Sequence, residues 1–261
     1  MKLSIITYSL HKLEQEGKSD VFTYMETAKY RFGLDTADIW NGSLKSLDKD
    51  YLRKVKDGLD ERGLTLVNLA IDQAHIWEDD PALREQNYRN ALANLRAAEM
   101  LGAKTVRLDC GGARDKTEWT AEQFDVIVRR YREYLKRASD NGYRLGPENH
   151  WGPAMAPQSL NQLCQAVADP RFGVLLHFGR WHGPDAEQGD DLVAPWAMHT
   201  HISGQTTIAA TRPKMDALRA AGYKGAWGVE YVSTRYAELA LRVAAVRDVL
   251  EQWRIEGRGE P

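Results

Sequence analysis

The sequence predicts a single (β/α)8 TIM barrel that occupies residues 1–261, and three observations support this fold class. Short β-branched or apolar runs recur about eight times along the chain, and most of them are separated by segments with helical periodicity. The composition shows no break that would mark a second domain. The length also agrees, because α/β barrels commonly fold about 250 residues as one unit.

The eight predicted strands are short apolar segments with many β-branched residues, a composition that favours extended backbone. They cover residues 3–7, 36–40, 64–71, 105–109, 144–150, 172–178, 197–203 and 226–232. An open doubly wound sheet is the alternative arrangement of such units. That fold usually has a glycine-rich phosphate-binding turn after its first strand, whereas the sequence here reads TYSLHKLEQEGK.

The helical segments between the strands have well-marked patterns and ends. In residues 50–63, Leu52, Val55 and Leu59 recur at spacings of three and four, which is the period of an amphipathic helix. Asp80 followed by Pro81 predicts an N-cap and a first helical residue. Further end signals are a capping box at Thr120 and Gln123 and left-handed C-caps at Gly33, Gly63, Gly102, Gly142 and Gly222.

Three segments in the C-terminal third carry their own expectations. Residues 183–196 have room for only a short helix, and residues 204–214 resemble a long loop after the seventh strand. Long loops beyond strand ends often carry functional residues, so Arg212 is a candidate to bind a substrate carboxylate or phosphate. Residues 234–253 predict a last long amphipathic helix, and we expect the polar tail after it to be frayed.

Charge and cysteine content exclude several classes of protein. The formal net charge is −2, from 35 basic and 37 acidic side chains, and no long basic run is present, which argues against a nucleic-acid partner. Cys110 and Cys164 make no disulfide framework, and we expect both to be ordinary buried thiols. No apolar stretch reaches the roughly 20 residues that span a bilayer, and the N-terminus lacks a signal-peptide pattern. We therefore expect a soluble, cytoplasmic protein without a membrane partner.

Carboxylates and imidazoles gather at the ends of the last four predicted strands. In an extended strand, residues i and i+2 face the same side, so Glu148 and His150 share a face at the end of the fifth strand. His177 lies near the end of the sixth strand, His201 near the end of the seventh and Glu230 near the end of the eighth. The carboxyl ends of neighbouring barrel strands meet at one mouth, where barrel active sites lie.

Four of these side chains form a candidate metal site. Glu148 and Glu230 offer carboxylates that neutralise a divalent ion, and His177 and His201 offer imidazoles that favour Mn, Fe, Co, Ni or Zn over Ca. His199 faces the same way as His201, so an exchange of these two ligands stays open. The expected cofactor is a divalent metal ion, with Mn, Co, Mg, Zn and Fe as the candidates.

Other polar and aromatic side chains are expected to line the mouth and bind substrate. Trp40 ends the second strand, His75 follows the third and Asp109 ends the fourth. Arg107 shares a face with Asp109, and a pair between them is the simplest expectation. The tryptophans that offer a stacking surface for the apolar face of a sugar are Trp77, Trp151 and Trp181.

The motifs at these strand ends resemble those of the xylose isomerase-like barrels, a family that includes sugar isomerases, ketose 3-epimerases, inosose dehydratases and enzymes of the endonuclease IV type. The motif ENH at residues 148–150 is similar to the family's strand-five ligand, HIS at 201–203 to its strand-seven histidine, and VEY at 229–231 to its strand-eight glutamate. The resemblance covers the whole chain in strand order. It implies that Glu148 and Glu230 both hold metal and move protons, and it implies a homo-oligomer, either a dimer or a tetramer.

The sixth strand departs from the family pattern. The family usually places Asp-x-x-His there, whereas this chain has His177-Phe178-Gly179-Arg180. His177 replaces the aspartate and can still bind metal, but Arg180 replaces the histidine and cannot. The exchange removes one negative charge near the metal and adds a fixed positive charge. This change favours an anionic or keto substrate and makes Arg180 a candidate substrate contact.

The predicted reaction is metal-dependent isomerisation or epimerisation of a sugar, a keto-sugar or a cyclitol. A proton is removed from the carbon next to a carbonyl, and the metal stabilises the enediolate that forms. Glu148 and Glu230 flank the substrate and transfer protons, with His150 as a substrate contact or an additional acid. The expected partner is a small-molecule carbohydrate.

Three alternatives stay open from the sequence. If His150 protonates a leaving hydroxyl beside the enediolate, the outcome is elimination, as in a lyase of the inosose dehydratase or keto-glycoside-cleaving type. If the altered sixth strand has lost the metal, the chain is a non-catalytic sugar-binding subunit. A nuclease of the endonuclease IV type would need more metal ligands and a basic face, and the sequence shows neither.

Overall fold

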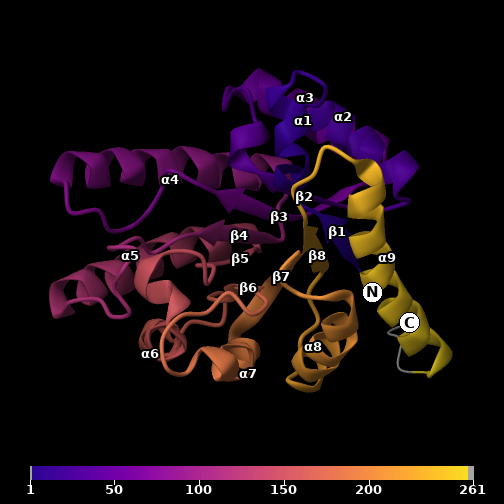
Figure 1. The fold of residues 1–261 in the computed structure, drawn as a ribbon. Coiled ribbons are helices and arrows are strands. Elements are labelled where there is room, and N and C mark those ends of the chain that lie inside the picture. Colours follow the sequence, from indigo (N-terminus) through magenta and orange to yellow (C-terminus); the bar gives the residue numbers. More distant parts are fainter. Residues whose placement is uncertain (1, 258–261) are drawn as a thin grey trace.

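The computed structural model describes residues 2–257, in which eight parallel strands are surrounded by helices (Figure 1). Every strand lies within its predicted range, and several are shorter because the chain turns into the mouth of the barrel. The strands are β1 Leu3–Ile5, β2 Thr36–Trp40, β3 Thr65–Ile71, β4 Thr105–Leu108, β5 Arg144–Gly146, β6 Val174–His177, β7 Ala197–Ser203 and β8 Trp227–Glu230.

The strands close into a barrel and do not form an open sheet. Two four-stranded ladders, in the orders β1-β8-β7-β6 and β2-β3-β4-β5, pair in parallel throughout. A bridge between Ile6 and Asp38 joins the ladders at one seam, and bridges at Leu145 and Glu148 join β5 to the β6 segment at the other. The predicted (β/α)8 barrel is therefore confirmed, and the doubly wound sheet is excluded.

A tyrosine side chain completes the seam between β1 and β2. The hydroxyl of Tyr24 donates a hydrogen bond to the carbonyl of Ile5 at 2.6 Å and accepts one from the backbone N–H of Asp38 at 2.8 Å. Thr36 also crosses the seam, because its hydroxyl donates to the carbonyl of Leu3. Side chains thus satisfy backbone groups that a continuous ladder would otherwise pair.

The helices form a ring around the strands (Figure 1). Figure 1 shows α1–α3 on one side, α4 and α5 on the next, α6–α8 opposite α1–α3, and α9 beside β1. The helices are α1 His11–Gln15, α2 Val21–Glu26, α3 Lys49–Glu61, α4 Pro81–Leu101, α5 Ala121–Asn141, α6 Pro157–Val167, α7 Gly189–Val193, α8 Ile208–Ala220 and α9 Tyr236–Ile255.

The predicted helix ends are confirmed. The carboxylate of Asp80 accepts the N–H of Ala82 at 2.9 Å, and Pro81 is the first residue of α4. Thr120 and Gln123 form the reciprocal capping box of α5. The five predicted C-cap glycines have φ angles from 60° to 94° in the left-handed region, where a side chain is disfavoured.

The C-terminal third contains one wrong prediction. Residues 204–214 are not a long loop, because α8 begins at Ile208, where the hydroxyl of Thr207 caps the helix by accepting the N–H of Ala210 at 3.1 Å. Pro213 lies inside this helix, although helix interiors usually disfavour proline. The sequence around Pro213 therefore did not reveal the helix. The short helix α7 and the long helix α9 agree with prediction. The expected frayed tail falls partly on residues 258–261, which lie outside the described residues.

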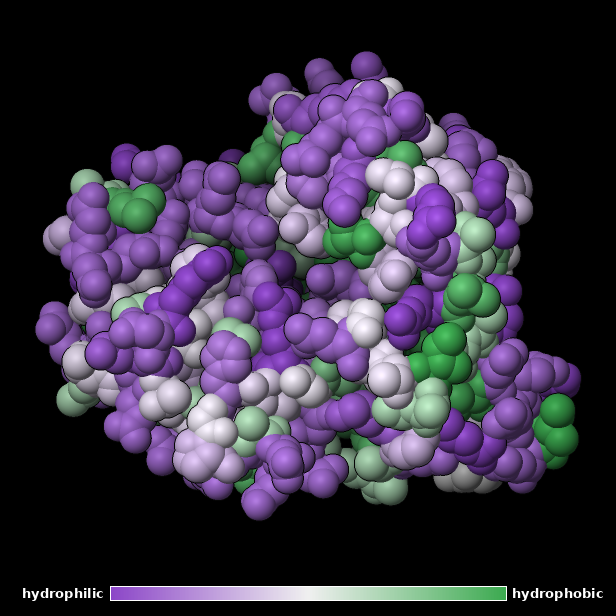
Figure 2. All heavy atoms as spheres, in the orientation of Figure 1, coloured by the Kyte–Doolittle hydropathy of each residue, from purple (hydrophilic) through white to green (hydrophobic). Residues whose placement is uncertain are grey.

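The surface in the same orientation is mostly hydrophilic (Figure 2). Figure 2 also shows hydrophobic residues gathered over α9, where Leu241 and Ile255 are 62% and 74% exposed. Cys110 and Cys164 are buried free thiols, as predicted. Within residues 2–257, no helix combines the length and apolarity that a membrane crossing requires.

We predict that Tyr24→Phe destabilises the barrel seam. The substitution leaves the buried carbonyl of Ile5 and N–H of Asp38 without their shared partner, so the free energy of unfolding should fall by about 1–3 kcal/mol. Urea denaturation measures this change. The control is Tyr30→Phe, at a residue that is 70% exposed, where the change should stay within about 0.5 kcal/mol. Equal effects of the two substitutions would contradict the role of Tyr24.

Candidate metal and catalytic site

The four predicted metal ligands converge on one point at the mouth of the barrel. One potential ligand atom from each of Glu148, His177, His201 and Glu230 lies within 4.8 Å of the others. The first three residues are at most 2% exposed, whereas the side chain of Glu230 is 18% exposed. The cluster therefore has a buried base and one side that faces solvent.

Direct contacts hold this cluster together. His177 Nδ1 lies 2.8 Å from Glu148 Oε1, and His201 Nδ1 lies 3.1 Å from Glu230 Oε2 and 3.6 Å from Glu148 Oε1. The two imidazole rings are nearly perpendicular, with centroids 6.1 Å apart. Each glutamate therefore contacts at least one imidazole, so every acidic group in the cluster has a basic neighbour.

The strand register brings these residues to the same level. His177 on β6 is paired with His201 on β7, and His201 is paired with Gly228 on β8. A Cβ atom at Gly228 would lie 2.3 Å from the carbonyl of Thr200 and 3.2 Å from the His201 ring. The absence of a side chain at Gly228 thus makes room for the imidazole.

A buried aspartate that sequence reasoning missed orients the histidines. Asp38 Oδ2 lies 2.6 Å from His199 Nε2 and 3.3 Å from His201 Nε2, and Asp38 Oδ1 accepts a hydrogen bond from Asn68 at 2.9 Å. Because His201 turns Nε2 toward Asp38, its Nδ1 faces the glutamates. A carboxylate behind a histidine is the usual outer support of a metal ligand. His201 also reaches Glu148 and Glu230 through Nδ1, whereas His199 is outside that four-residue cluster, so the structure favours His201 as the ligand.

A buried arginine balances the negative charge beneath the cluster. Arg107 Nη1 lies 2.7 Å from Asp72 and 3.1 Å from Asp109, and Arg107 Nε lies 3.3 Å from Glu148 Oε2. The expected pair between Arg107 and Asp109 is confirmed. Its single positive charge offsets part of the negative charge of the three carboxylates, and the contact between Asp109 and His150 and the partial exposure of Asp72 reduce the remaining cost.

Asp109 takes a different place from the one predicted. We expected it to bind substrate, but it is 1% exposed and its oxygens accept the backbone N–H of Glu148 at 3.1 Å and contact His150 Nδ1 at 2.9 Å. Both oxygens are thus used within the protein. The predicted strand face shared by Glu148 and His150 is also wrong, because β5 ends at Gly146 and residues 149–150 form a turn. His150 is held by Asp109 instead.

Arg180 lies at the mouth beside the cluster. Its Nη1 atom is 3.4 Å from His177 Nδ1. The side chain of Asn149 fixes the neighbouring backbone by donating to the carbonyls of His177 and Arg180 at 2.8 and 3.1 Å and by accepting the N–H of His177 at 2.7 Å. The positive charge that replaces the family histidine therefore remains next to the candidate ligands.

Aromatic residues form two groups around the mouth. Trp40 donates its indole N–H to Asp72 at 2.8 Å and packs edge-on against Tyr8 and His11. Tyr8 and His11 were not predicted, because they follow β1 in a segment without a recognisable motif.

His75 belongs to the second group. Its Nδ1 lies 2.8 Å from Glu78, and its ring centroid is 4.8 Å from that of Trp151. Trp77 and Trp181, expected as stacking surfaces, are 6% and 7% exposed and belong to the core. His75 and Trp151 thus remain candidates for substrate contact.

Arg212 does not join the site. It lies on α8, where its guanidinium pairs with Asp216 on the same helix and with Glu256 after α9. The prediction that Arg212 meets a substrate anion depended on a loop, and the helix removes that basis.

The electrostatic environment keeps the glutamates ionised. Burial alone would raise the pKa of the Glu148 carboxyl, but the charge of His150 and hydrogen bonds from His177 and His201 lower this pKa well below its usual range. Burial likewise opposes ionisation of Glu230, but the hydrogen bond and charge of His201 lower the pKa of its carboxyl. Both residues are therefore carboxylates at neutral pH.

The histidines shift in the opposite direction. Burial would lower the pKa of His201, but hydrogen bonds with Asp38, Glu148 and Glu230 raise it well above its usual value. Burial also opposes protonation of His150, but the Glu148 charge and the Asp109 contact raise the pKa of its imidazole. The carboxylates around His201 therefore favour a positive charge at this histidine, either as a bound proton or as a metal ion.

The residues present fit a divalent metal. His201 Nδ1 is buried beside two carboxylate oxygens, at 3.1 Å from Glu230 Oε2 and 3.6 Å from Glu148 Oε1. Such a nitrogen and two ionised glutamates match the preference of Mn, Fe, Co and Zn for mixed nitrogen and oxygen ligands. Glu148, His177, His201 and Glu230 would hold the ion.

The chain belongs to the xylose isomerase-like TIM barrel family, whose model matches residues 26–253. The resemblance read from the strand-end motifs is thus confirmed. No curated protein was found to match the sequence.

Several solved structures share the fold. A D-psicose 3-epimerase determined with D-fructose has a TM-score of 0.73 and 15% identity, and the match covers 99% of this chain and 100% of that chain. The 3-keto-D-glucoside 4-epimerase of E. coli has a TM-score of 0.68 and 15% identity over 91% and 95% of the two chains. A probable 3-DHS dehydratase from Bacillus anthracis has a TM-score of 0.61 and 17% identity over 94% and 89%. At these identities the likeness shows the fold alone.

We predict that Asp38→Asn weakens metal binding by about 10- to 100-fold, because the amide no longer provides the charge and the acceptor that orient His201. Calorimetric titration of the metal-free protein with Co²⁺ measures the affinity. Asp35→Asn is the control, because that carboxylate is 83% exposed and its ion pair is with Lys29, far from the cluster in the sequence. An unchanged Co²⁺ affinity in a folded Asp38→Asn protein would show that Asp38 does not support the site.

The stability of the metal-free protein should fall as the pH rises above about 6.5, the ordinary histidine pKa. The raised pKa values of His150 and His201 contribute stability that is complete below that pH and is lost as the pH passes through the folded-state values. Co²⁺ competes with the proton on His201, so its stabilisation should grow over the same range. Melting temperatures from pH 6 to 8.5, with and without Co²⁺, test both trends. A flat profile without metal would contradict them.

Proposed function

We propose that the protein is a metal-dependent isomerase or epimerase that acts on a sugar, a keto-sugar or a cyclitol by removing a proton next to a carbonyl. The observation that carries this proposal is the pair of ionised carboxylates, Glu148 and Glu230, which both contact the His201 imidazole and cluster with His177. The reaction needs a base beside an electrophilic centre, and this cluster combines the two functions.

When bound, a divalent ion supplies electrophilic stabilisation of negative charge on the substrate oxygens. The protein residues determine how protons move around that charge. Glu148 is constrained, because Oε1 contacts His177 and Oε2 contacts Arg107. Glu230 is more exposed and contacts the cluster through His201. Glu230 is therefore the better placed base, and Glu148 is the more firmly held anchor, which can return a proton from the opposite side.

His150 supplies a second kind of proton transfer. Its imidazole is held by Asp109 and is 26% exposed, and its raised pKa favours the protonated form. A protonated imidazole at the mouth can donate to a substrate oxygen while a glutamate removes a proton from carbon. In an epimerase this donation neutralises the developing enediolate.

Arg180 and the aromatic residues orient the substrate. The guanidinium beside His177 adds a fixed positive charge on the solvent side of the cluster, which suits a carbonyl oxygen or an anionic substituent. Trp40, His75 and Trp151 provide ring surfaces for the apolar face of a sugar. The shared fold of two sugar epimerases supports a carbohydrate substrate.

A lyase is the alternative function. If the oxygen that His150 protonates is a leaving hydroxyl or an aglycone oxygen, the same proton abstraction leads to elimination. The contact of His150 with Asp109 favours this possibility, because it orients a proton donor that simple proton exchange would not require. The shared fold of a probable dehydratase is consistent with it.

The test is solvent deuterium uptake into ketoses, inososes and 3-keto-glucosides by the protein loaded with Mn²⁺ or Co²⁺. Glu230→Gln and Glu148→Gln should each slow exchange by about 10²- to 10⁴-fold, because each removes a carboxylate that transfers protons. Glu118→Gln, at an exposed residue in the segment before α5, is the matched control and should not change the rate. Exchange that survives both glutamine substitutions would refute the proposal, and a metal-free protein that only binds these compounds would indicate a sugar-binding subunit.

A further inference from the structure

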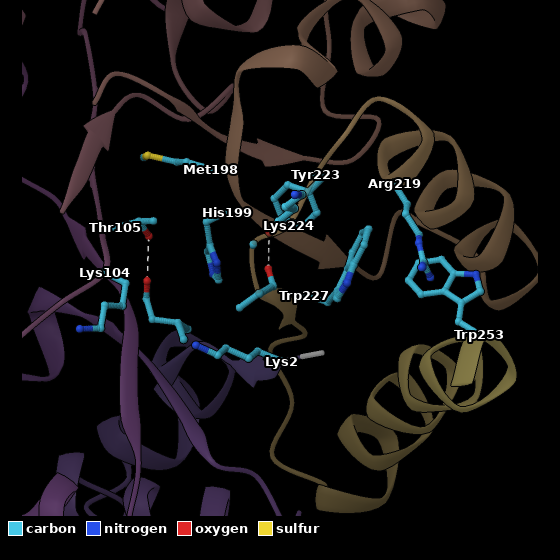
Figure 3. Close-up of a pocket in the computed structure, with 13 residues that line it drawn as sticks. Lys2, Lys104, Thr105, Met198, His199, Arg219, Tyr223, Lys224, Trp227 and Trp253 are labelled. Atoms are coloured by element: carbon cyan, nitrogen blue, oxygen red, sulfur yellow. Dashed lines mark hydrogen bonds between the residues drawn. The ribbon is translucent and has the colours of Figure 1, made fainter. Parts of the chain in front are cut away.

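A second cavity opens at the opposite end of the barrel, where the strands begin (Figure 3). It has a volume of about 400 Å³ and is lined by the first residues of β4, β7 and β8, together with Lys2 before β1. None of the four candidate metal ligands lines it. The cavity is therefore a separate feature from the mouth.

This cavity is cationic although the chain as a whole has a net charge of −2. Its lining includes Lys2, Lys104, Arg219 and Lys224 but no aspartate or glutamate (Figure 3). Within residues 2–257, none of these four side chains forms an ion pair. Four uncompensated positive charges around one hollow repel one another, and an anion in the hollow would relieve that repulsion.

Two buried polar atoms lack partners in the cavity wall. Arg219 Nη1 and His199 Nδ1 are buried without a hydrogen-bond partner among the described residues. His199 is fully buried and its Nε2 contacts Asp38, so Nδ1 is the ring nitrogen that still needs a hydrogen-bond partner. Buried polar groups almost always have a partner, so these atoms indicate a missing ligand. The ligand needs an anionic oxygen for Arg219 and a hydroxyl that can donate to His199.

The remaining wall is aromatic. Trp227 and Trp253 are at most 3% exposed, and Tyr223 is 8% exposed. The guanidinium of Arg219 lies 4.5 Å from the Trp253 ring, which holds the cation at the cavity. The space is much larger than a phosphate group needs, so it has room for an organic body as well.

We propose that this cavity binds a phosphorylated small molecule, which is held by the cationic side chains around the cavity and by a hydroxyl that donates to His199. A phosphate monoester of a compound that also carries a hydroxyl group supplies the negative charge and acceptor oxygens through its phosphate and the donor through its organic part. The inference rests on the cavity alone and does not depend on the proposed reaction at the mouth.

The test is calorimetric titration of the full-length, metal-free protein with glycerol 3-phosphate and with inorganic pyrophosphate, at constant ionic strength. At least one probe should bind at a single saturable site. Arg219→Gln and Lys104→Gln should each raise its Kd by about 10- to 100-fold, because each removes a charged hydrogen bond. Lys104 is exposed, so its substitution should leave the fold intact.

Two further variants complete the experiment. Lys54→Gln is the matched control, because this exposed lysine on α3 is outside the cavity, and it should leave the Kd unchanged. Arg180→Gln should also leave the Kd unchanged, because Arg180 lies at the mouth. The proposal is wrong if neither probe binds saturably, or if binding is lost in Arg180→Gln and retained in Arg219→Gln.

Discussion

The carboxylate of Asp38 joins the closure of the barrel to the geometry of the candidate site. The backbone N–H of Asp38 donates a hydrogen bond to the Tyr24 hydroxyl at the seam between β1 and β2, and the side chain of Asp38 contacts His199 and His201. A buried carboxylate is costly unless it is paired, and the two imidazoles together with Asn68 provide that pairing. The contact between Asp38 and His201 therefore has two effects. It lowers the cost of burying the Asp38 carboxylate, and it turns His201 Nδ1 toward Glu148 and Glu230.

Charge balance explains how so many acids can meet in one place. Arg107 offsets part of the negative charge beneath the cluster, and His177 occupies the position where the family usually has an aspartate. The two candidate ligand glutamates carry two negative charges, which match the charge of a divalent ion. Arg180 adds a positive charge beside them. This balance favours the build-up of negative charge on a bound carbonyl compound, as proton abstraction requires.

Local patterns predicted the strands and helix ends, and the barrel topology that followed from them predicted that the four candidate ligands would cluster. The support of those ligands was not predictable in this way. Asp38 is a single acid within an apolar strand, and its partner His199 is 161 residues away. Asp109 was misplaced for the same reason, because its partners are set by tertiary contacts. Arg212 was misplaced because Pro213 concealed a helix that Thr207 caps.

The four candidate ligands come from both of the four-stranded ladders that make up the barrel. Glu148 follows the last strand of one ladder, whereas His177, His201 and Glu230 belong to the other. An ion held by all four would fasten the two halves together across the seam between β5 and β6, where isolated bridges take the place of a continuous ladder. Its departure would have to precede separation of the halves, so the bound form should be protected against unfolding chiefly through a slower opening rate.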